Sequence, residues 1–222
     1  LLNWFGLPIP SLSSIGLTLL NGGFIQERCG MIHKIGKHWF WYKRFAELGI
    51  PTLLTVTGKG IFEFPNVRFL SNRSCVIATS IRTNMEGISQ VIPVFQRAGV
   101  QEIHVAHLPK AFPFHLDLVF GLANHDLGVV YPAGLDYYTI RYLESKGIRL
   151  IEASEKETRL CAPNLLAIEP GKVVIPAGCS DVTRSLRKEG VDAIEVDLST
   201  FAPGSGCTCI PAVLIRDDSL PV

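Results

Sequence analysis

Four side chains in this sequence have the types that cysteine-dependent catalysis needs: Cys209, His115, Glu63 and Asp117. In such chemistry a thiolate attacks an electron-poor carbon, an imidazole moves the proton, and a carboxylate orients its partners. His115 has Asp117 two residues further on, and Cys209 follows a Gly-Ser-Gly stretch at 204–206 where the backbone can approach a ligand closely. The pattern predicts Cys209 as nucleophile and His115 as its acid/base partner.

Two rival interpretations involve the neighbouring thiol, Cys207. It could itself be the nucleophile, or it could bind zinc together with Cys209 and His115, since thiolates and imidazole suit that metal. The one-residue gap in Cys207-Thr208-Cys209 does not match the CxxC spacing of redox or zinc sites. We therefore expect no metal and no cofactor, and we expect Cys207 to be a packing residue on the face opposite Cys209 of an extended segment.

Glu63 lies between Phe62 and Phe64, which predicts a carboxylate that is not freely exposed. Because burying an unpaired charge is costly, such an acid is expected to have a cationic partner. The remaining histidines are interpreted as structural; they are His33, His38, His104, His107 and His125.

A repeated sequence pattern predicts the structural elements that position these residues. Four glycines, Gly49, Gly99, Gly147 and Gly190, are spaced by 50, 48 and 43 residues, and each follows a helix-like stretch and precedes a β-branched run. Glycine after a helix is the usual left-handed cap, and the runs that follow are typical of strands. The sequence therefore predicts a helix, a glycine cap and a strand in each of four segments.

Pairs of strand-like runs complete the units. They cover 15–20 with 23–26, 67–70 with 75–79, 117–121 with 128–131, and 164–168 with 173–176. The result is an α/β chain of ββαβ-like units of roughly 45–50 residues, a period typical of solenoids, propellers and closed arrays. A doubly wound parallel sheet is the alternative, but no unit has the Gly-rich phosphate loop common there. We expect one domain over 1–222, with the first repeat incomplete.

In a closed array the equivalent loops of successive units meet near one axis. Those loops cover 62–66, 114–117, 161–164 and 204–209, and they contain Glu63, His115 and Cys209. The repeat thus predicts that these catalytic residue types converge.

The composition of the chain argues against several classes of protein. The chain has 222 residues, 47% of them hydrophobic, and a formal net charge of +1, without the basic excess typical of nucleic-acid binders. No apolar run reaches the roughly 18–20 residues that span a bilayer. The first basic residue is Arg28, so a signal peptide is not indicated, and the six cysteines are scattered apart from the last pair. We expect a reducing, cytoplasmic compartment, with no nucleic-acid and no membrane partner.

Four motifs together resemble a known family. They are FEFPN (Phe62–Asn66), SIRTN (Ser80–Asn84), HLDLVF (His115–Phe120) and GCTC (Gly206–Cys209). Their order and spacing resemble the guanidino-group-modifying enzymes: arginine deiminases, dimethylarginine dimethylaminohydrolases and amidinotransferases. The resemblance implies the pentein fold, an α/β propeller of five ββαβ units around a pseudo-fivefold axis.

The resemblance also implies a reaction and a set of contacts. Cys209 would attack the guanidino carbon to form a covalent amidino-cysteine, and His115 would protonate the leaving amine and then activate water. Glu63 and Asp117 would hold the guanidinium by charge-assisted hydrogen bonds. By position in the motifs and loops, Asn66, Asn164 and Ser14 are expected to line the substrate site.

Departures from the family pattern keep alternatives open. The family's Glu-Gly-Gly-Asp is here Glu63-Phe64-Pro65-Asn66, and Ser14 stands where many members have an aspartate that contacts the guanidinium. That acid is expected either upstream of Leu1 or not at all. The leading prediction is a hydrolase of a small guanidino compound, possible as a homo-oligomer. The alternatives are an amidinotransferase and a non-catalytic pentein binding protein.

Overall fold

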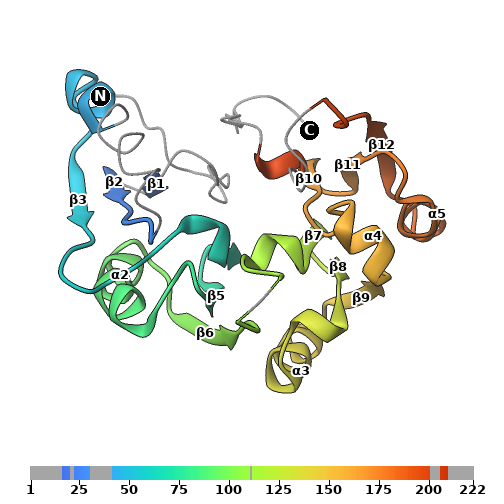
Figure 1. The fold of residues 1–222 in the computed structure, drawn as a ribbon, viewed down its shortest axis with the longest axis horizontal. Helices are drawn as coiled ribbons and strands as arrows, with labels where there is room; N and C mark the ends of the chain where they lie inside the picture. The colour runs from blue at the N-terminus through green and yellow to red at the C-terminus, as the bar shows by residue number, and fades with distance from the viewer. Residues whose placement is uncertain (1–16, 21–22, 31–41, 111, 201–205, 210–222) are drawn as a thin grey trace. The chain divides into compact units, whose positions relative to one another are not determined.

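The computed structural model describes residues 17–20, 23–30, 42–110, 112–200 and 206–209 (Figure 1). In this part of the chain, twelve strands form four separate three-stranded sheets, in the orders β1-β2-β3, β4-β5-β6, β7-β8-β9 and β10-β11-β12. A single open parallel sheet, the alternative considered from the sequence, is therefore wrong.

The strand bounds follow the predicted runs closely. The first two sheets contain β1 Leu17–Leu20, β2 Gly23–Gln26, β3 Thr52–Thr55, β4 Val67–Phe69, β5 Ser74–Thr79 and β6 Glu102–His107. The other two contain β7 Phe120–Asn124, β8 Leu127–Val130, β9 Arg149–Glu152, β10 Leu166–Glu169, β11 Lys172–Pro176 and β12 Asp192–Val196.

A helix separates the second and third strands of every sheet. These helices are residues 42–47, α2 Met85–Arg97, α3 Tyr137–Ser145 and α5 Ser180–Lys188. A further short helix, α4 Glu155–Arg159, precedes β10, and short 3-10 turns occur at η2 Phe64–Asn66, η3 Leu116–Leu118, η4 Pro132–Gly134 and η5 Cys207–Cys209. The predicted ββαβ unit is thus present four times among the described residues.

Strand directions explain why a helix is needed in each unit. In the first, third and fourth sheets the first two strands form an antiparallel hairpin, and the third strand runs parallel to the second. A parallel partner requires a crossover connection, which the helix supplies. Each hairpin therefore pairs with the strand that follows it in the chain, after the next helix.

The four predicted helix caps are confirmed by backbone geometry. Gly49, Gly99, Gly147 and Gly190 have φ of 71°, 103°, 77° and 81°, in the left-handed region that side chains other than glycine rarely adopt. The spacing of these glycines in the sequence therefore marks the helix ends correctly.

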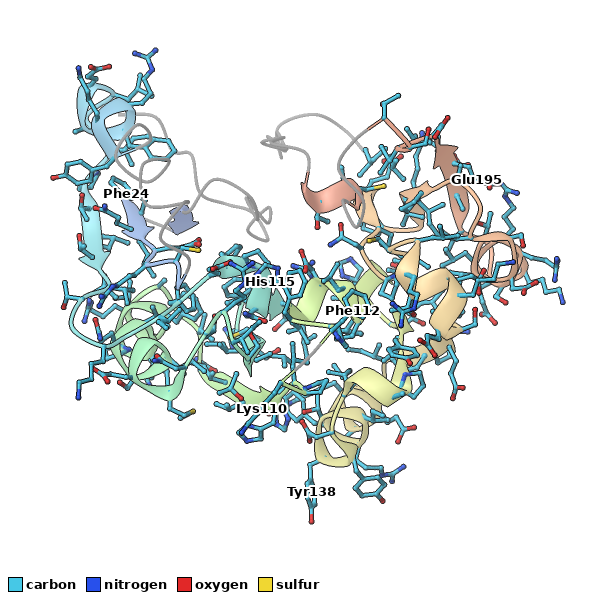
Figure 2. The ribbon with its side chains drawn as sticks, viewed as in Figure 1. Phe24, Lys110, Phe112, His115, Tyr138 and Glu195 are labelled. Atoms are coloured by element: carbon cyan, nitrogen blue, oxygen red, sulfur yellow. The ribbon has the colours of Figure 1, made fainter. Side chains whose placement is uncertain are left out.

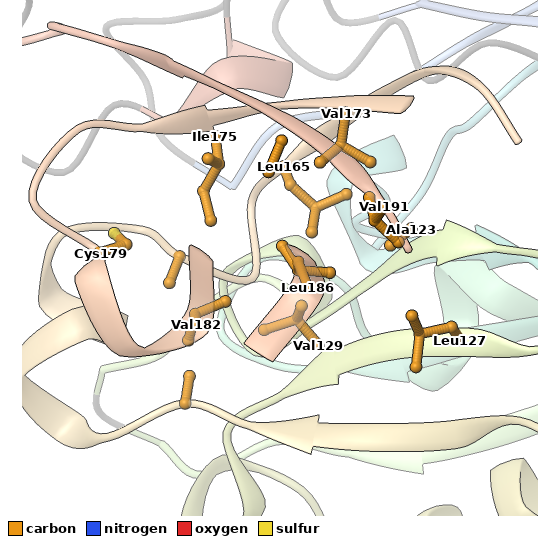
Figure 3. Packing of buried hydrophobic residues seen from close by; sticks show 13 residues of the cluster. Ala123, Leu127, Val129, Leu165, Val173, Ile175, Cys179, Val182, Leu186 and Val191 are labelled. Carbon is orange, nitrogen blue, oxygen red and sulfur yellow. The ribbon is translucent and has the colours of Figure 1, made fainter. Parts of the chain in front are cut away.

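The chain divides into two compact units, residues 1–103 with 211–222, and residues 104–210. In the second unit one hydrophobic cluster joins the third and fourth sheets. Figure 3 shows Val182 and Leu186 of α5 beside Val129 of β8 and Leu165, all of them buried. In the first unit the aromatic rings of Phe62 and Phe69 pack on Phe95 of α2. No helix among the described residues is long and apolar enough to cross a membrane.

Candidate active site

Glu63 and His115 occupy equivalent backbone positions. Each is the extended residue before a 3-10 turn, Glu63 with φ −126° and ψ 129° before η2, and His115 with φ −131° and ψ 147° before η3. Each turn leads into the first strand of a sheet, η2 into β4 and η3 into β7. The predicted equivalence of the two loops is therefore confirmed at the level of the backbone.

In the first unit, Glu63 is buried and paired. Its Oε1 lies 3.2 Å from Nη1 of Arg82, whose side chain is also buried. The thiol of Cys29 donates to the same oxygen at 2.7 Å, and its sulfur lies 3.6 Å from Arg82 Nη1. The cationic partner expected from the flanking phenylalanines is thus present, although the sequence argument named neither Arg82 nor Cys29 as its contacts.

Two of the motifs behind the family resemblance are hydrogen-bonded to each other. Asn66 Nδ2 donates to Ser80 Oγ at 3.1 Å and to Thr83 Oγ1 at 3.0 Å. The backbone N–H of Glu63 donates to Thr83 Oγ1 at 3.1 Å. The SIRTN segment therefore fixes both ends of the turn that begins at Glu63, and the proposed contact of Asn66 with a substrate stays a prediction.

In the second unit, His115, labelled in Figure 2, is half-buried. Asp117 is buried inside η3. The ring of Phe114 packs edge-on to the imidazole, with centroids 5.0 Å apart. Leu116 and Leu118 are also buried, so the turn is anchored in the protein by three consecutive side chains. This arrangement leaves His115 half-buried at the start of a fixed turn, and its role as a proton shuttle stays a prediction.

The turn that carries the predicted nucleophile is held against that loop. Thr208, between the two cysteines of η5, lies with Oγ1 3.2 Å from Asp117 Oδ2 and 2.7 Å from Asn164 Oδ1. The backbone N–H of Thr208 donates to Asn164 Oδ1 at 2.8 Å, and Asn164 Nδ2 donates to the Asp117 carbonyl at 3.3 Å. Three loops far apart in sequence thus meet in one buried network.

The expectation of an extended segment at Cys207–Cys209 is wrong. The three residues form a 3-10 turn, in which successive side chains are about 120° apart rather than alternating between two faces. Cys207 is buried, as expected of a packing residue. The side chains of Cys209 and Ser14 lie outside the described residues, so the convergence of Cys209 with His115 stays a prediction.

Two of the described cysteines, Cys75 and Cys179, do not resemble nucleophiles. Five cysteines are described, all buried and none in a disulfide: Cys29, Cys75, Cys161, Cys179 and Cys207. Burial raises the pKa of Cys75 to about 12. Burial, and then the nearby charge of Glu157, raise the pKa of Cys179 to about 12. Since the thiolate is the reactive form, these two thiols are inert at neutral pH.

Metal binding has no support from the described part of the chain, where no group of three or more His, Cys, Asp or Glu side chains could hold a metal ion. The zinc set considered from the sequence includes Cys209, whose side chain is not described.

No family model matches the chain. A 2-nitroimidazole nitrohydrolase from a Mycobacterium species is 29% identical over 194 residues, which cover 82% of this chain and 50% of the relative. The arginine deiminase of Bacillus cytotoxicus is 25% identical over 217 residues, with coverage of 80% and 53%, and that of Limosilactobacillus reuteri is 26% identical over 214 residues, with coverage of 79% and 52%. The chain spans about half the length of these curated relatives.

Solved structures show a similar fold. The product-bound N-terminal domain of ArgZ, a cyanobacterial arginine dihydrolase, superposes with a TM-score of 0.81 at 17% identity, covering 95% of this chain and 77% of that one. A mutant of DDAH from Pseudomonas aeruginosa complexed with citrulline gives 0.74 at 20% identity, covering 90% and 74%. Together with the sequence relatives, these structures confirm the resemblance to guanidino-group-modifying enzymes of the pentein fold.

Proposed function

We propose that this relative of the guanidino-modifying enzymes is a cysteine-dependent hydrolase that acts on the guanidino or amidino carbon of a small molecule. The observation that carries the proposal is the 3.2 Å contact between Thr208 Oγ1 and Asp117 Oδ2. His115 lies two residues before Asp117, and Cys209 directly follows Thr208. One contact therefore connects the loop that bears the proton shuttle with the turn that bears the nucleophile.

The proposed reaction has two halves. In the first, the Cys209 thiolate attacks the guanidino carbon, a C–S bond forms, and the C–N bond breaks as His115 gives a proton to the departing amine. In the second, His115 takes a proton from water as the oxygen adds to the amidino carbon, and the C–S bond breaks. The products are an amine or ammonia and a urea-type compound, and the thiolate is restored.

Glu63 and Asp117 are proposed to orient the planar substrate by charge-assisted hydrogen bonds. Asn66, Asn164 and Ser14 are proposed to line the site, and of these Asn66 and Asn164 are buried. No metal or cofactor is required by this chemistry.

For the fold, we propose that the four described units belong to a closed propeller around a pseudo-fivefold axis, within one domain over 1–222. The repeated ββαβ topology and the ArgZ superposition support it. A reducing, cytoplasmic compartment is also proposed, supported by five described cysteines that form no disulfide.

One observation favours a second candidate function, the release of nitrite from a nitroimidazole-like ring. The Glu63 carboxylate already has a buried cationic partner in Arg82, which lowers its attraction for a cationic substrate and suits a neutral one. The carbon between the two ring nitrogens of a 2-nitroimidazole resembles a guanidino carbon in geometry. The similarity to a 2-nitroimidazole nitrohydrolase supports this candidate. Thiolate attack would then expel nitrite with its electron pair, and water would complete the hydrolysis.

An activity screen tests the proposal and separates its variants. The purified chain is incubated with arginine, methylated arginines, agmatine, guanidino acids and 2-nitroimidazole, and ammonia, methylamines, citrulline and nitrite are measured. Adding glycine or ornithine as an acceptor detects an amidinotransferase, because amidino transfer needs an amine in place of water.

Variants identify the nucleophile. We expect Cys209→Ser to abolish turnover, Cys207→Ser to keep most of it, and His115→Ala to accumulate the covalent adduct on Cys209, detected by mass spectrometry after quenching. An adduct on Cys207, or full activity of Cys209→Ser, contradicts the assignment. Absence of turnover and of any adduct across the whole panel supports a non-catalytic binding protein.

A further inference from the structure

We infer that Asn164 and Thr208 are positioning residues that lock the Cys209-bearing turn onto the His115–Asp117 loop. The contacts that define this lock are observed; its consequence for catalysis rests on the proposed function. Neither residue needs to touch the substrate for the inference to hold.

Both polar atoms of the Asn164 side chain are hydrogen-bonded to protein partners. Its Oδ1 accepts from both the N–H and the hydroxyl of Thr208, at 2.8 and 2.7 Å, and its Nδ2 donates to the Asp117 carbonyl at 3.3 Å. Its own carbonyl accepts from the N–H of Cys207 at 3.0 Å. One fully buried residue therefore binds two consecutive residues of the nucleophile turn and the loop of the proton shuttle.

The Thr208 hydroxyl links the two acceptors that flank it. It has one hydrogen, and among the described residues Asn164 Oδ1 lies within reach at 2.7 Å and Asp117 Oδ2 at 3.2 Å. The hydrogen is shared between an amide that is fixed in place and a carboxylate proposed to orient the substrate. The position of the Asp117 carboxylate is therefore tied to that of the turn.

Close backbone packing makes the lock rigid. A Cβ on Gly206 would lie 2.3 Å from Asn164 Oδ1, so only glycine fits before the turn. A Cβ on Gly121 of β7 would lie 2.1 Å from the carbonyl oxygen of Pro163, the neighbour of Asn164. Cys161, three residues before Asn164, has φ +64°, a costly conformation for a side chain other than glycine. The loop is thus fixed on both sides at close range.

The lock is expected to set the positions of the reacting groups. A displacement of about 1 Å in a reacting group can cost on the order of 100-fold in rate, even when the substituted residue lies away from the chemistry. Loosening the lock should therefore lower kcat more than it raises KM, because it displaces reacting groups without removing any group that is proposed to touch the substrate.

The first test is Thr208→Val against Thr208→Ser. Valine keeps the shape and removes the hydroxyl, whereas serine keeps the hydroxyl. We expect Thr208→Val to lower kcat at least about 10-fold with KM within about twofold, and Thr208→Ser to restore kcat to within about threefold of wild type. Equal kcat for Thr208→Val and wild type, or no rescue by serine, overturns the inference.

Thr183 offers a matched control in the same unit. It is a buried threonine on α5, and among the described residues its Oγ1 has no hydrogen-bond partner. Thr183→Val should therefore leave kcat and KM unchanged. A loss of kcat in Thr183→Val equal to that in Thr208→Val means that any buried threonine disturbs the enzyme, and the specific role of Thr208 is then wrong.

A second test needs no turnover, and so separates failure of the lock from failure of the proposed function. Amide hydrogen exchange is measured at Cys207 and Thr208 in wild type and Asn164→Ala. Because the Thr208 N–H loses its acceptor, we expect its exchange to accelerate at least about 10-fold, while that of Cys207, bonded to the retained backbone carbonyl, changes less. Unchanged exchange at Thr208 overturns the lock itself; changed exchange without turnover on any substrate contradicts only the proposed function.

Discussion

The 3-10 turns that precede the second and third sheets have the same backbone conformation but different side chains. The first has a buried carboxylate, Glu63, before the turn, and the second has a half-buried imidazole, His115, at that position and a carboxylate, Asp117, inside the turn. The Glu63 carboxylate contacts the guanidinium of Arg82 and the thiol of Cys29. Asp117 instead contacts the hydroxyl of Thr208 through its carboxylate and the side-chain amide of Asn164 through its backbone carbonyl. A repeated unit thus reuses a turn whose side chains have diverged.

The difference shows that the two turns are stabilised by different kinds of interaction. The Glu63 turn depends on charge compensation between two buried ionised groups, which fails badly when one partner is removed. The Asp117 turn depends on close packing and on hydrogen bonds from neutral donors, each of which contributes less. Four substitutions break or sharpen this contrast, and they are ordered by the size of the effect.

The largest effect is expected for Arg82→Met, which leaves the Glu63 carboxylate without its buried cation. The expected loss is about 3–5 kcal/mol of unfolding free energy, measured by urea denaturation. The double variant Arg82→Met with Glu63→Gln should regain much of it, because no buried charge remains uncompensated. A loss below about 1 kcal/mol in the single variant contradicts the charge-compensation account.

Glu157 provides a buried carboxylate in the second unit with a purely structural role. Its Oε1 accepts from the N–H groups of Asp181 and Val182 at 2.9 and 3.1 Å, at the start of α5, and its Oε2 accepts from Ser154 Oγ at 3.0 Å. Glu157→Ala leaves these donors unsatisfied and should cost about 2–3 kcal/mol. Glu157→Gln keeps an acceptor and should cost only about 1 kcal/mol, chiefly the interaction of the charge with the helix N-terminus. Equal losses in thermal unfolding would argue against a capping role.

Gly206→Ala tests the packing around the nucleophile turn. The added Cβ would meet Asn164 Oδ1 at 2.3 Å, and we expect a loss of about 1–3 kcal/mol together with a fall in kcat. Gly30→Ala is the control, because there the nearest atoms lie at an ordinary 3.4 Å, and its unfolding free energy should change by less than about 0.5 kcal/mol. Similar losses for both glycines would mean that the close contact at Gly206 is not the cause.

The smallest effect concerns acid stability at Asp136, the N-cap of α3. Burial opposes ionisation, but hydrogen bonds from the His107 N–H, the Thr139 hydroxyl and the Thr139 N–H, with the charge of His104, outweigh it and lower the pKa of Asp136. A lowered pKa stabilises the fold above the unfolded value of about 3.9, and this contribution is lost as pH falls through the lower folded value. We expect the unfolding free energy of Asp136→Asn to fall less steeply than that of wild type below about pH 4. Identical slopes would contradict this assignment.

Much of the architecture followed from the sequence because its causes are local. A glycine after an amphipathic helix fixes the left-handed cap whatever the surroundings, and the β-branched runs between turn residues fix the strands. The flanking phenylalanines of Glu63 likewise predicted burial and hence a cation, because the desolvation penalty of a carboxylate holds in any fold. The sequence by itself thus determined the units, the caps and the types of residue at each candidate loop.

The identities of the contacts were decided by tertiary structure. Cys29 and Arg82 lie 34 and 19 residues from Glu63, and Asn164 and Thr208 lie 47 and 91 residues from Asp117, separations over which no local pattern specifies a partner. The 3-10 turn at Cys207–Cys209 also escaped the sequence argument, because strand alternation was assumed where the backbone is instead shaped by its bonds to Asn164. A buried hydrogen-bond network depends on which loops the sheets bring together, and this is fixed only when the units pack.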